Sequence, residues 1–181
     1  MKEIFANVLR AIPAAEGVRK LAPGAGEEFD IAGARLTWKV KGEESGYAFS
    51  IAEQALGPGE GVPLHRHPYA EAFYVLQGQV DFFRLLSGKE DWVRCEAGAT
   101  VIVPSNAPHA FYNKTSEPGR VLGISSHLHQ AFFDAVAAAD KRKSFAALPL
   151  AEAMDRVAQI ASGHALQFIP YDVNADDRGQ K

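Results

Sequence analysis

The sequence has little of what marks an oxidised, membrane-spanning or nucleic-acid-binding protein. Its 181 residues include one cysteine, Cys95, which has no partner for an internal disulfide and indicates a reducing compartment, or at least no dependence on oxidation. No stretch approaches the run of about 18 apolar residues that a bilayer-crossing helix needs. The net charge is -3 and basic residues cluster only at 141–143, which excludes an obvious nucleic-acid surface. We expect a cytoplasmic protein whose partners are small molecules or proteins.

Linkers and internal repeats are also lacking, which predicts one domain over residues 1–181. A chain of this length buries about 70% of the surface of its unfolded state, enough for a hydrophobic core. The composition is 47% apolar and 23% charged, with 16 glycines and 10 prolines that indicate many turns. These features favour a turn-rich β protein.

Short segments rich in β-branched and aromatic residues recur between residues 28 and 125, separated by glycine, proline and asparagine. Their regular spacing predicts a sandwich or barrel. Gly78 lies between two apolar runs, so we expect a hairpin that makes neighbours of 73–77 and 80–85. The predicted strands are 29–31, 35–41, 47–54, 72–77, 80–85, 92–95, 100–103, 109–113 and 121–125.

Helical periodicity replaces this pattern after residue 125. Apolar residues recur at helical intervals over 128–139 and 150–161, which predicts two amphipathic helices in a C-terminal extension over about 126–163. Ser126 is a candidate N-cap. A third, short helix is expected over 1–12, where polar residues interrupt any signal-peptide core. A last strand is expected over 165–169, and residues 174–181 are polar enough to fray.

Three metal-ligating side chains follow one another closely at His65, His67 and Glu71. Read as one extended strand over 65–75, the alternation of side chains places them on one face, beside apolar residues. Each buried polar group without a partner costs about 1–3 kcal/mol, and a divalent cation would remove that cost. The cluster therefore suggests a mononuclear metal site.

Two spaced motifs extend this cluster. Gly59, His65, His67, Glu71 and Gly78 read G-x5-H-x-H-x3-E-x6-G, and a second motif, G-x5-P-x-G-x2-H-x3-N, is carried by Gly98, Pro104, His109 and Asn113. Over residues 59–113 the chain resembles the cupin superfamily, and more loosely the single-domain cupins related to quercetin dioxygenases. Asn106 stands where the second motif has glycine, and asparagine tolerates the positive φ that such a turn needs.

The resemblance implies an all-β core, a double-stranded β-helix of the jelly-roll type, with the short N-terminal and two C-terminal helices added. It also implies that His65, His67, Glu71 and His109 bind one divalent transition metal per chain, Fe, Mn, Ni, Co or Zn, with coordination positions left open. Two alternatives stay open: a polar cluster in a metal-free cupin, and a metal that serves stability alone.

The surroundings of the site are expected to be apolar. Phe73 and Val75 share the face of Glu71, and Phe111 shares that of His109, while Arg66 points away by alternation. The absence of inward Arg or Lys in the motif strands favours a substrate with an aromatic or hydrophobic body over an acid. The expected substrate pocket consists of Phe49, Ile51, Phe73, Val75 and Phe111.

The leading hypothesis is a metal-dependent oxidoreductase, a quercetinase-like dioxygenase acting on a small aromatic or enolisable substrate, with Glu71 as catalytic base. The alternatives are a non-catalytic metal- or ligand-binding cupin and a cupin isomerase or decarboxylase. The C-terminal helices are candidates for closing the barrel mouth, and exposed edges favour a homodimer.

A second His-x-His pair, His127 and His129, occurs where the first C-terminal helix is expected to begin. Residues two apart do not share a helix face, so we favour a surface or capping role for both. A contribution of His129 to the pocket rim is the minority interpretation.

Overall fold

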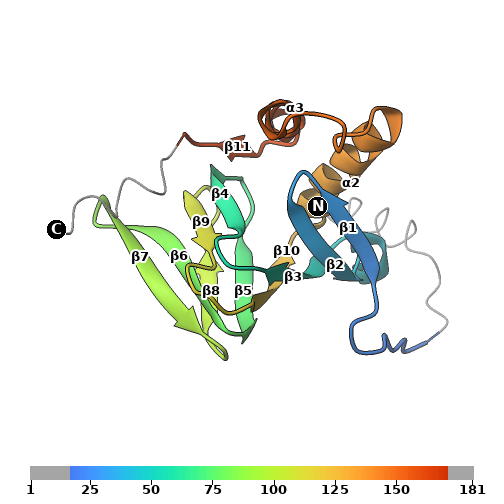
Figure 1. The fold of residues 1–181 in the computed structure, drawn as a ribbon. Coiled ribbons are helices and arrows are strands. Elements are labelled where there is room, and N and C mark those ends of the chain that lie inside the picture. The colour runs from blue at the N-terminus through green and yellow to red at the C-terminus, as the bar shows by residue number, and fades with distance from the viewer. Residues whose placement is uncertain (1–16, 171–181) are drawn as a thin grey trace, which may run out of the picture.

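The computed structural model describes residues 17–170 as two antiparallel β-sheets with two helices at one end (Figure 1). The helix expected over 1–12 and the frayed end expected over 174–181 lie outside the described residues. The mostly β architecture agrees with the expected β-sandwich of the jelly-roll type. Within residues 17–170, no helix has both the length and the apolar content to cross a membrane.

Each sheet combines strands that are distant in the sequence, and all the strand pairs are antiparallel. The larger sheet has the order β1 (Glu27–Ile31), β2 (Ala34–Val40), β3 (Ser50–Leu56), β10 (Gly119–Ser125), β5 (Glu71–Gln77) and β8 (Thr100–Val103). The smaller sheet has the order β11 (Gln167–Phe168), β4 (Gly61–Arg66), β9 (His109–Tyr112), β6 (Gln79–Leu86) and β7 (Lys89–Glu96).

The prediction of a hairpin at Gly78 is wrong. β5 pairs with β10 and β8 in the larger sheet, whereas β6 pairs with β7 and β9 in the smaller one, so the chain crosses between sheets at this point. Gly78 does have a positive φ of 70°, and a Cβ there would lie 2.6 Å from the carbonyl oxygen of Pro118. The position therefore requires glycine, but for a crossing rather than a hairpin.

The strand expected over 47–54 begins later than predicted. A 3-10 helix, η1 (Gly42–Ser45), follows β2, and Tyr47 has a φ of 62°, so regular pairing starts at Ser50. Ser45 holds this turn, since its hydroxyl lies within hydrogen-bond distance of the backbone oxygens of Gly42 and Phe49.

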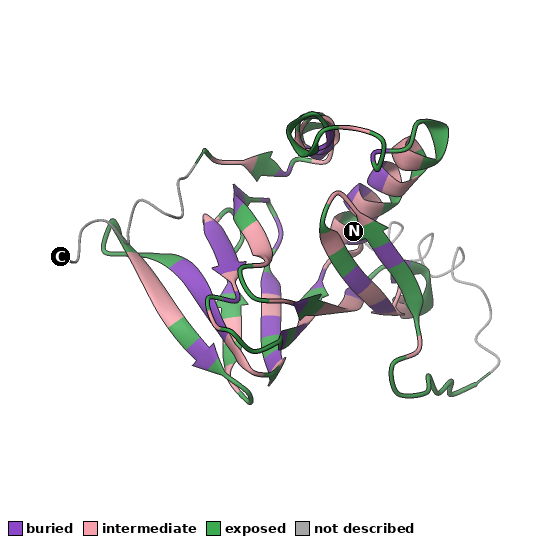
Figure 2. Ribbon diagram, in the orientation of Figure 1, coloured by how far each residue is buried: buried purple, intermediate pink, exposed green. Residues whose placement is uncertain are grey.

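The two larger of three hydrophobic cores among residues 17–170 occupy different parts of the fold, and buried and exposed residues alternate along the strands (Figure 2). The sandwich core lies between the two sheets and consists of Leu56, Phe73, Val75, Val80, Phe82, Cys95, Val103, Phe111 and Val121. The helical core joins β1 and β2 to α2 (His127–Arg142) and α3 (Leu150–Gly163). Its buried members are Phe29, Leu36, Trp38, Phe132, Val136, Phe145, Ala153, Val157, Ala161 and Leu166.

The N-cap expected at Ser126 is confirmed. The backbone N–H of Leu128 donates to its hydroxyl, 3.2 Å away, so α2 begins one residue beyond the end of β10. The first turn of α2 is therefore fixed to the larger sheet.

Candidate metal centre

The four motif residues reach one point from both sheets. His65 lies near the end of β4 and pairs across to His109 at the start of β9, in the smaller sheet. Glu71 opens β5 in the larger sheet, and His67 lies in the short connection between them. The expectation of one continuous strand over 65–75 is therefore wrong, because the chain leaves one sheet after Arg66 and enters the other at Glu71.

The alternation on which that expectation rested still holds. Every second residue from 65 to 75 is buried, although the residues belong to two strands and a connection: His65, His67, Tyr69, Glu71, Phe73 and Val75. Arg66 is exposed, as expected from the alternation, and donates to the side chain of Gln167. The period of two in burial survives the break, although the connection bends at Pro68 and Tyr69 between the sheets.

The candidate ligand atoms form a tight, buried group. One atom each from His65, His67, Glu71 and His109 lies within 4.8 Å of the others. All four residues are buried, with exposed fractions between 1% and 4%. Three imidazole nitrogens and one carboxylate oxygen are a donor set that suits divalent transition metals, so this group could bind a metal ion.

Backbone carbonyls fix the orientation of all three imidazoles. The Nδ1 atoms of His65, His67 and His109 lie 2.8, 2.8 and 2.9 Å from the carbonyl oxygens of Pro63, Tyr69 and Ala107. A carbonyl only accepts, so each Nδ1 carries the hydrogen and each Nε2 has a free lone pair. This is how metal-binding histidines are normally oriented, because the outer hydrogen bond selects the tautomer.

The carboxylate of Glu71 lies close to two of the imidazoles, in an arrangement that favours a bound cation. Its Oε2 lies 3.0 Å from Nε2 of His67 and 3.2 Å from Nε2 of His109. Two nitrogen lone pairs facing a carboxylate oxygen repel it unless a proton or a metal ion lies between them. The residues therefore fit a bound metal.

Burial and neighbouring charge have opposite effects on the pKa of Glu71. Burial alone would raise the pKa of its carboxyl group, but the nearby His129 and the rings of His109 and His67 that face the carboxylate outweigh it, so the pKa lies well below its usual range. Burial, followed by the proximity of His109, lowers the pKa of His65 to about 3. Without metal, His65 therefore stays neutral and Glu71 stays ionised near neutral pH.

The turn before His109 has the expected conformation. Asn106 has a φ of 63°, which confirms that asparagine adopts the left-handed conformation here. Its backbone N–H donates to the carbonyl oxygen of His67, 2.8 Å away. This bond ties the loop that leads to His109 to the connection that carries His67.

A small cavity lies beside Glu71, between the larger sheet and α2. Its volume is about 40 Å³, and its lining contains no Lys or Arg. The hydroxyl of Ser125 lies at this cavity and is buried without a hydrogen-bond partner among the described residues. The lining residues are Leu36, Trp38, Ser50, Ala52, Gln54, Glu71, Phe73, Val121, Gly123, Ser125, His129 and Phe133.

Of the five residues expected to form the pocket, the structure places only Phe73 at this cavity. Val75 and Phe111 are buried in the sandwich core. Phe49 is 41% exposed, and Ile51 lies between Ser50 and Ala52, which face the cavity. At this cavity β3 therefore presents the side chains that alternate with Phe49 and Ile51.

His129 belongs to the site, contrary to the favoured surface or capping role. Its Nδ1 lies 2.5 Å from Oε1 of Glu71, and its side chain is 19% exposed. His127 points elsewhere, with its ring 5.6 Å from that of Tyr47. The rule that residues two apart diverge on a helix is correct, but it does not show which histidine faces the sheet. Phe133, one turn later and also at the cavity, is the signal that favoured His129.

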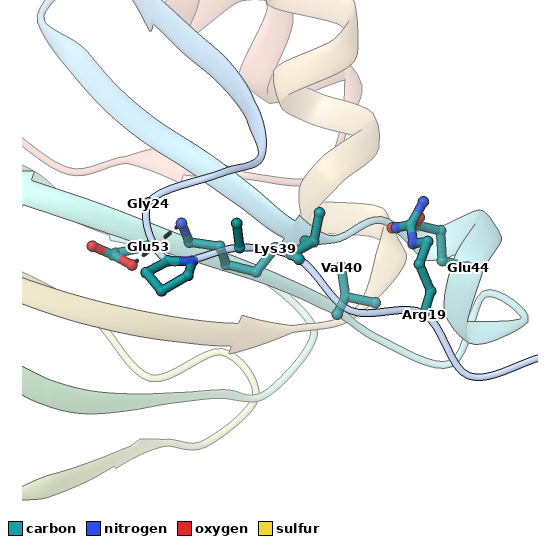
Figure 3. Close-up of a pocket in the computed structure, with 9 residues that line it drawn as sticks. Arg19, Gly24, Lys39, Val40, Glu44 and Glu53 are labelled. Atoms are coloured by element: carbon teal, nitrogen blue, oxygen red, sulfur yellow. Dashed lines mark hydrogen bonds and ion pairs between the residues drawn. The ribbon is translucent and has the colours of Figure 1, made fainter.

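A larger hollow of about 470 Å³ lies on another part of the surface, beside β2 and β3 (Figure 3). Lys39 contacts Glu53 at 3.4 Å and the carbonyl oxygen of Ala25 at 3.0 Å, and Arg19 pairs with Glu44. Because its charged groups are paired with one another, this hollow offers no cluster comparable with the buried one at Glu71.

Comparison with known proteins agrees with this fold. Residues 52–125, which include all four candidate ligands, match the family model of the cupin domain. A search of curated proteins finds no significant match. The structure of the polyketide cyclase RemF from Streptomyces resistomycificus is similar with a TM-score of 0.52 at 18% identity, covering 61% of this chain and 80% of that chain.

Two further similar structures have lower TM-scores. A cupin-like protein from Thermotoga maritima has a TM-score of 0.46 at 21% identity, covering 53% of this chain and 70% of that chain. A mutant of oxalate decarboxylase from Bacillus subtilis has a TM-score of 0.48 at 22% identity, covering 55% of this chain and 27% of that chain. The cupin-domain match, together with the two-sheet fold, supports the cupin superfamily for this chain.

Proposed function

We propose that this protein is a metal-dependent oxidoreductase, a dioxygenase of the quercetinase type that acts on a small enolisable substrate. His65, His67, Glu71 and His109 hold one divalent transition metal per chain. The observation that carries the proposal is a group of three carbonyl-tethered imidazoles and the Glu71 carboxylate, with one candidate ligand atom each within 4.8 Å of the others, at the edge of a cavity without Lys or Arg.

The protein residues have separate tasks in this reaction. A bound divalent ion supplies Lewis-acid chemistry and exchangeable coordination positions. Glu71, whose carboxylate lies at the cavity, acts as the base that accepts the substrate proton. Trp38, Phe73 and Phe133 contribute aromatic walls that exclude water from the cavity.

The cavity limits the size of the substrate. Pockets for drug-sized ligands measure about 300–1,000 Å³, whereas a single water molecule needs about 10–15 Å³ of space for its centre. At about 40 Å³, the cavity favours a small diketone or similar enolisable compound over a multi-ring flavonol, unless α2 moves outward. The missing basic side chain disfavours a carboxylate substrate, and with it the decarboxylase alternative.

The test is a dioxygen-uptake screen on protein purified without chelators or a histidine tag, after elemental analysis of its metal. We expect one metal ion per chain and dioxygen uptake with a small diketone, lost in Glu71→Gln and unchanged in His127→Ala, a matched histidine outside the site. Metal-replete protein that consumes no dioxygen with diketones, flavonols or related enolisable compounds would remove the dioxygenase assignment.

The small cavity also supports a second candidate, a metal-binding cupin without turnover. In that case the protein retains one metal per chain, and the metal exchanges water or small anions without consuming substrate. Stoichiometric metal with an inactive screen, together with small-anion binding seen as a spectral change of the Co(II)-substituted protein, would favour this candidate.

A further inference from the structure

The two oxygens of Glu71 have different neighbours. Oε2 faces the Nε2 atoms of His67 and His109, at 3.0 and 3.2 Å, on the side where the candidate ligands converge. Oε1 lies 2.5 Å from Nδ1 of His129, which comes from α2 rather than from either sheet. The carboxylate is therefore shared between the ligand cluster and the helix.

We propose that His129 is a positioning residue that holds Oε1 of Glu71, so that the carboxylate binds the metal through Oε2 alone. The proposal rests on the metal site proposed above, but not on any particular reaction. It assigns α2 a direct effect on metal coordination, in addition to its place in the helical core.

The geometry distinguishes this role from that of a fifth ligand. The atoms of the ligand group lie within 4.8 Å of one another, and the group does not include His129. The imidazole of His129 instead packs beside His67 and Tyr69, with ring centroids 5.7 Å from each, and beside Phe133 at 5.1 Å. These neighbours restrict the ring and leave its Nδ1 directed at Oε1.

The first turn of α2 is itself held in place. Ser126, the N-cap, directly follows β10, which pairs with β5 through Ala72, the residue next to Glu71. Gln130 is 3% exposed, and its side-chain oxygen accepts a hydrogen bond of 2.6 Å from the backbone N–H of Gly42. His129 lies between these two anchors, so its distance from Glu71 is set by the fold and not by a free side chain.

Close packing at Gly42 gives a third constraint on the same turn. A Cβ at this position would lie 2.7 Å from the Cβ of His127, so η1 and α2 approach as closely as a glycine allows. The helix cannot shift toward η1, and the reach of His129 to the carboxylate is fixed on that side as well.

Holding one oxygen has a chemical consequence. A carboxylate that is free to rotate can bind a metal through either oxygen or through both, whereas one held at Oε1 presents a single lone-pair direction to the ion. Outer hydrogen-bond partners of metal ligands typically contribute about 10- to 100-fold to metal affinity.

The test uses the full-length protein loaded with Co(II), whose visible spectrum reports coordination number and geometry. In His129→Ala, we expect Co(II) affinity, measured by chelator competition, to fall by about 10- to 100-fold, with a change in the visible bands as Glu71 becomes free to bind through both oxygens. His129→Asn should restore most of both signals, because the Nδ2 of asparagine can replace Nδ1. His127→Ala, the control on the same helix, should match the wild type.

A double-mutant cycle separates this role from general support of the fold. If His129 acts through Glu71, His129→Ala costs little further Co(II) affinity in a Glu71→Gln background. Equal losses in both backgrounds would overturn the proposal. A wild-type Co(II) spectrum and affinity in folded His129→Ala would overturn it too, as would a His129→Asn protein no better than His129→Ala. None of these readouts requires dioxygenase activity, so an inactive screen leaves this test intact.

Discussion

The sandwich core and the helical core are built differently, and the cavity beside Glu71 lies where they meet. In the sandwich core, Phe73, Phe82 and Phe111 pack against one another with ring centroids 5.1 to 5.5 Å apart. In the helical core, Phe133 of α2 packs edge-on against Phe29 and Trp38, at 5.0 and 5.7 Å. One core therefore joins sheet to sheet, and the other joins sheet to helix.

The difference explains how the site is divided. The strands around the sandwich core, with the connection between β4 and β5, carry every candidate ligand, so the ligand geometry depends on strand pairing. The helical core supplies His129 and Phe133, which cover Glu71 and wall the cavity. The sandwich side thus supplies the candidate metal ligands, and the helical side supplies residues that contact Glu71 and line the cavity.

The largest expected effect comes from removing a ligand on the sandwich side. In His67→Ala, we expect the protein to lose stoichiometric metal while it stays folded, because one of three imidazole donors is gone and the apolar cores are intact. Metal content by mass spectrometry and circular dichroism measure the two results. His127→Ala should keep its metal, and full occupancy in His67→Ala would show that His67 is not a ligand.

The next effect tests whether the helical core matters for metal retention. Phe132 is 5% exposed in α2, and Phe132→Ala should lower the free energy of unfolding by about 3–5 kcal/mol, measured by urea denaturation. We expect one metal per chain to remain at saturating metal, because every ligand lies on the sandwich side. Phe82→Ala, at a residue 2% exposed in the sandwich core, is the matched control, and we expect a similar loss of free energy of unfolding for it. Loss of metal from folded Phe132→Ala would show that metal retention also depends on the helical core.

The sandwich side was predictable from sequence because its information is local. The spacing of His65, His67 and Glu71 predicted that all three are buried together, and they are, although they belong to two sheets and the connection between them. Positive φ at Gly78 was expected from a glycine between two apolar runs, and at Asn106 from the motif glycine whose place it takes, and both are confirmed. The pairing of the strands could not be predicted from local sequence, because it depends on the long-range topology of two sheets.

The helical side was less predictable because it depends on how α2 docks. Periodicity predicted both C-terminal helices and the cap at Ser126, but the contact of His129 with Glu71 spans more than fifty residues of sequence. Ser50, Ala52 and Gln54 of β3 line the cavity, and Phe49 and Ile51, which were expected at the pocket, do not.

A change of pH provides a smaller and more gradual test of the sandwich side. Burial lowers the pKa of His65 to about 3, so in the range between this value and its unfolded value near 6.5 the unfolded chain binds the proton more readily. The stability that the neutral ring contributes is fully present above about pH 6.5 and is lost as the pH falls toward 3.

The measurement is urea denaturation of metal-free protein across this pH range. We expect the free energy of unfolding to fall by a few kcal/mol on acidification, and His65→Asn, which cannot take up the proton, should show a shallower fall. Equal slopes for the two proteins would mean that His65 does not carry the pH dependence.

The smallest expected effect concerns the loop that joins His67 to His109. Asn106 is exposed, has a φ of 63°, and donates its backbone N–H to the carbonyl oxygen of His67, a bond that glycine would also make. Glycine adopts this conformation without strain but adds freedom to the unfolded chain, so Asn106→Gly should change the free energy of unfolding by no more than about 1 kcal/mol and leave metal content unchanged. Asn106→Val is the contrasting variant, because a β-branched residue is strained at positive φ and should destabilise the loop and weaken metal binding. Loss of metal in Asn106→Gly would mean that the side chain, and not the backbone conformation, supports the site.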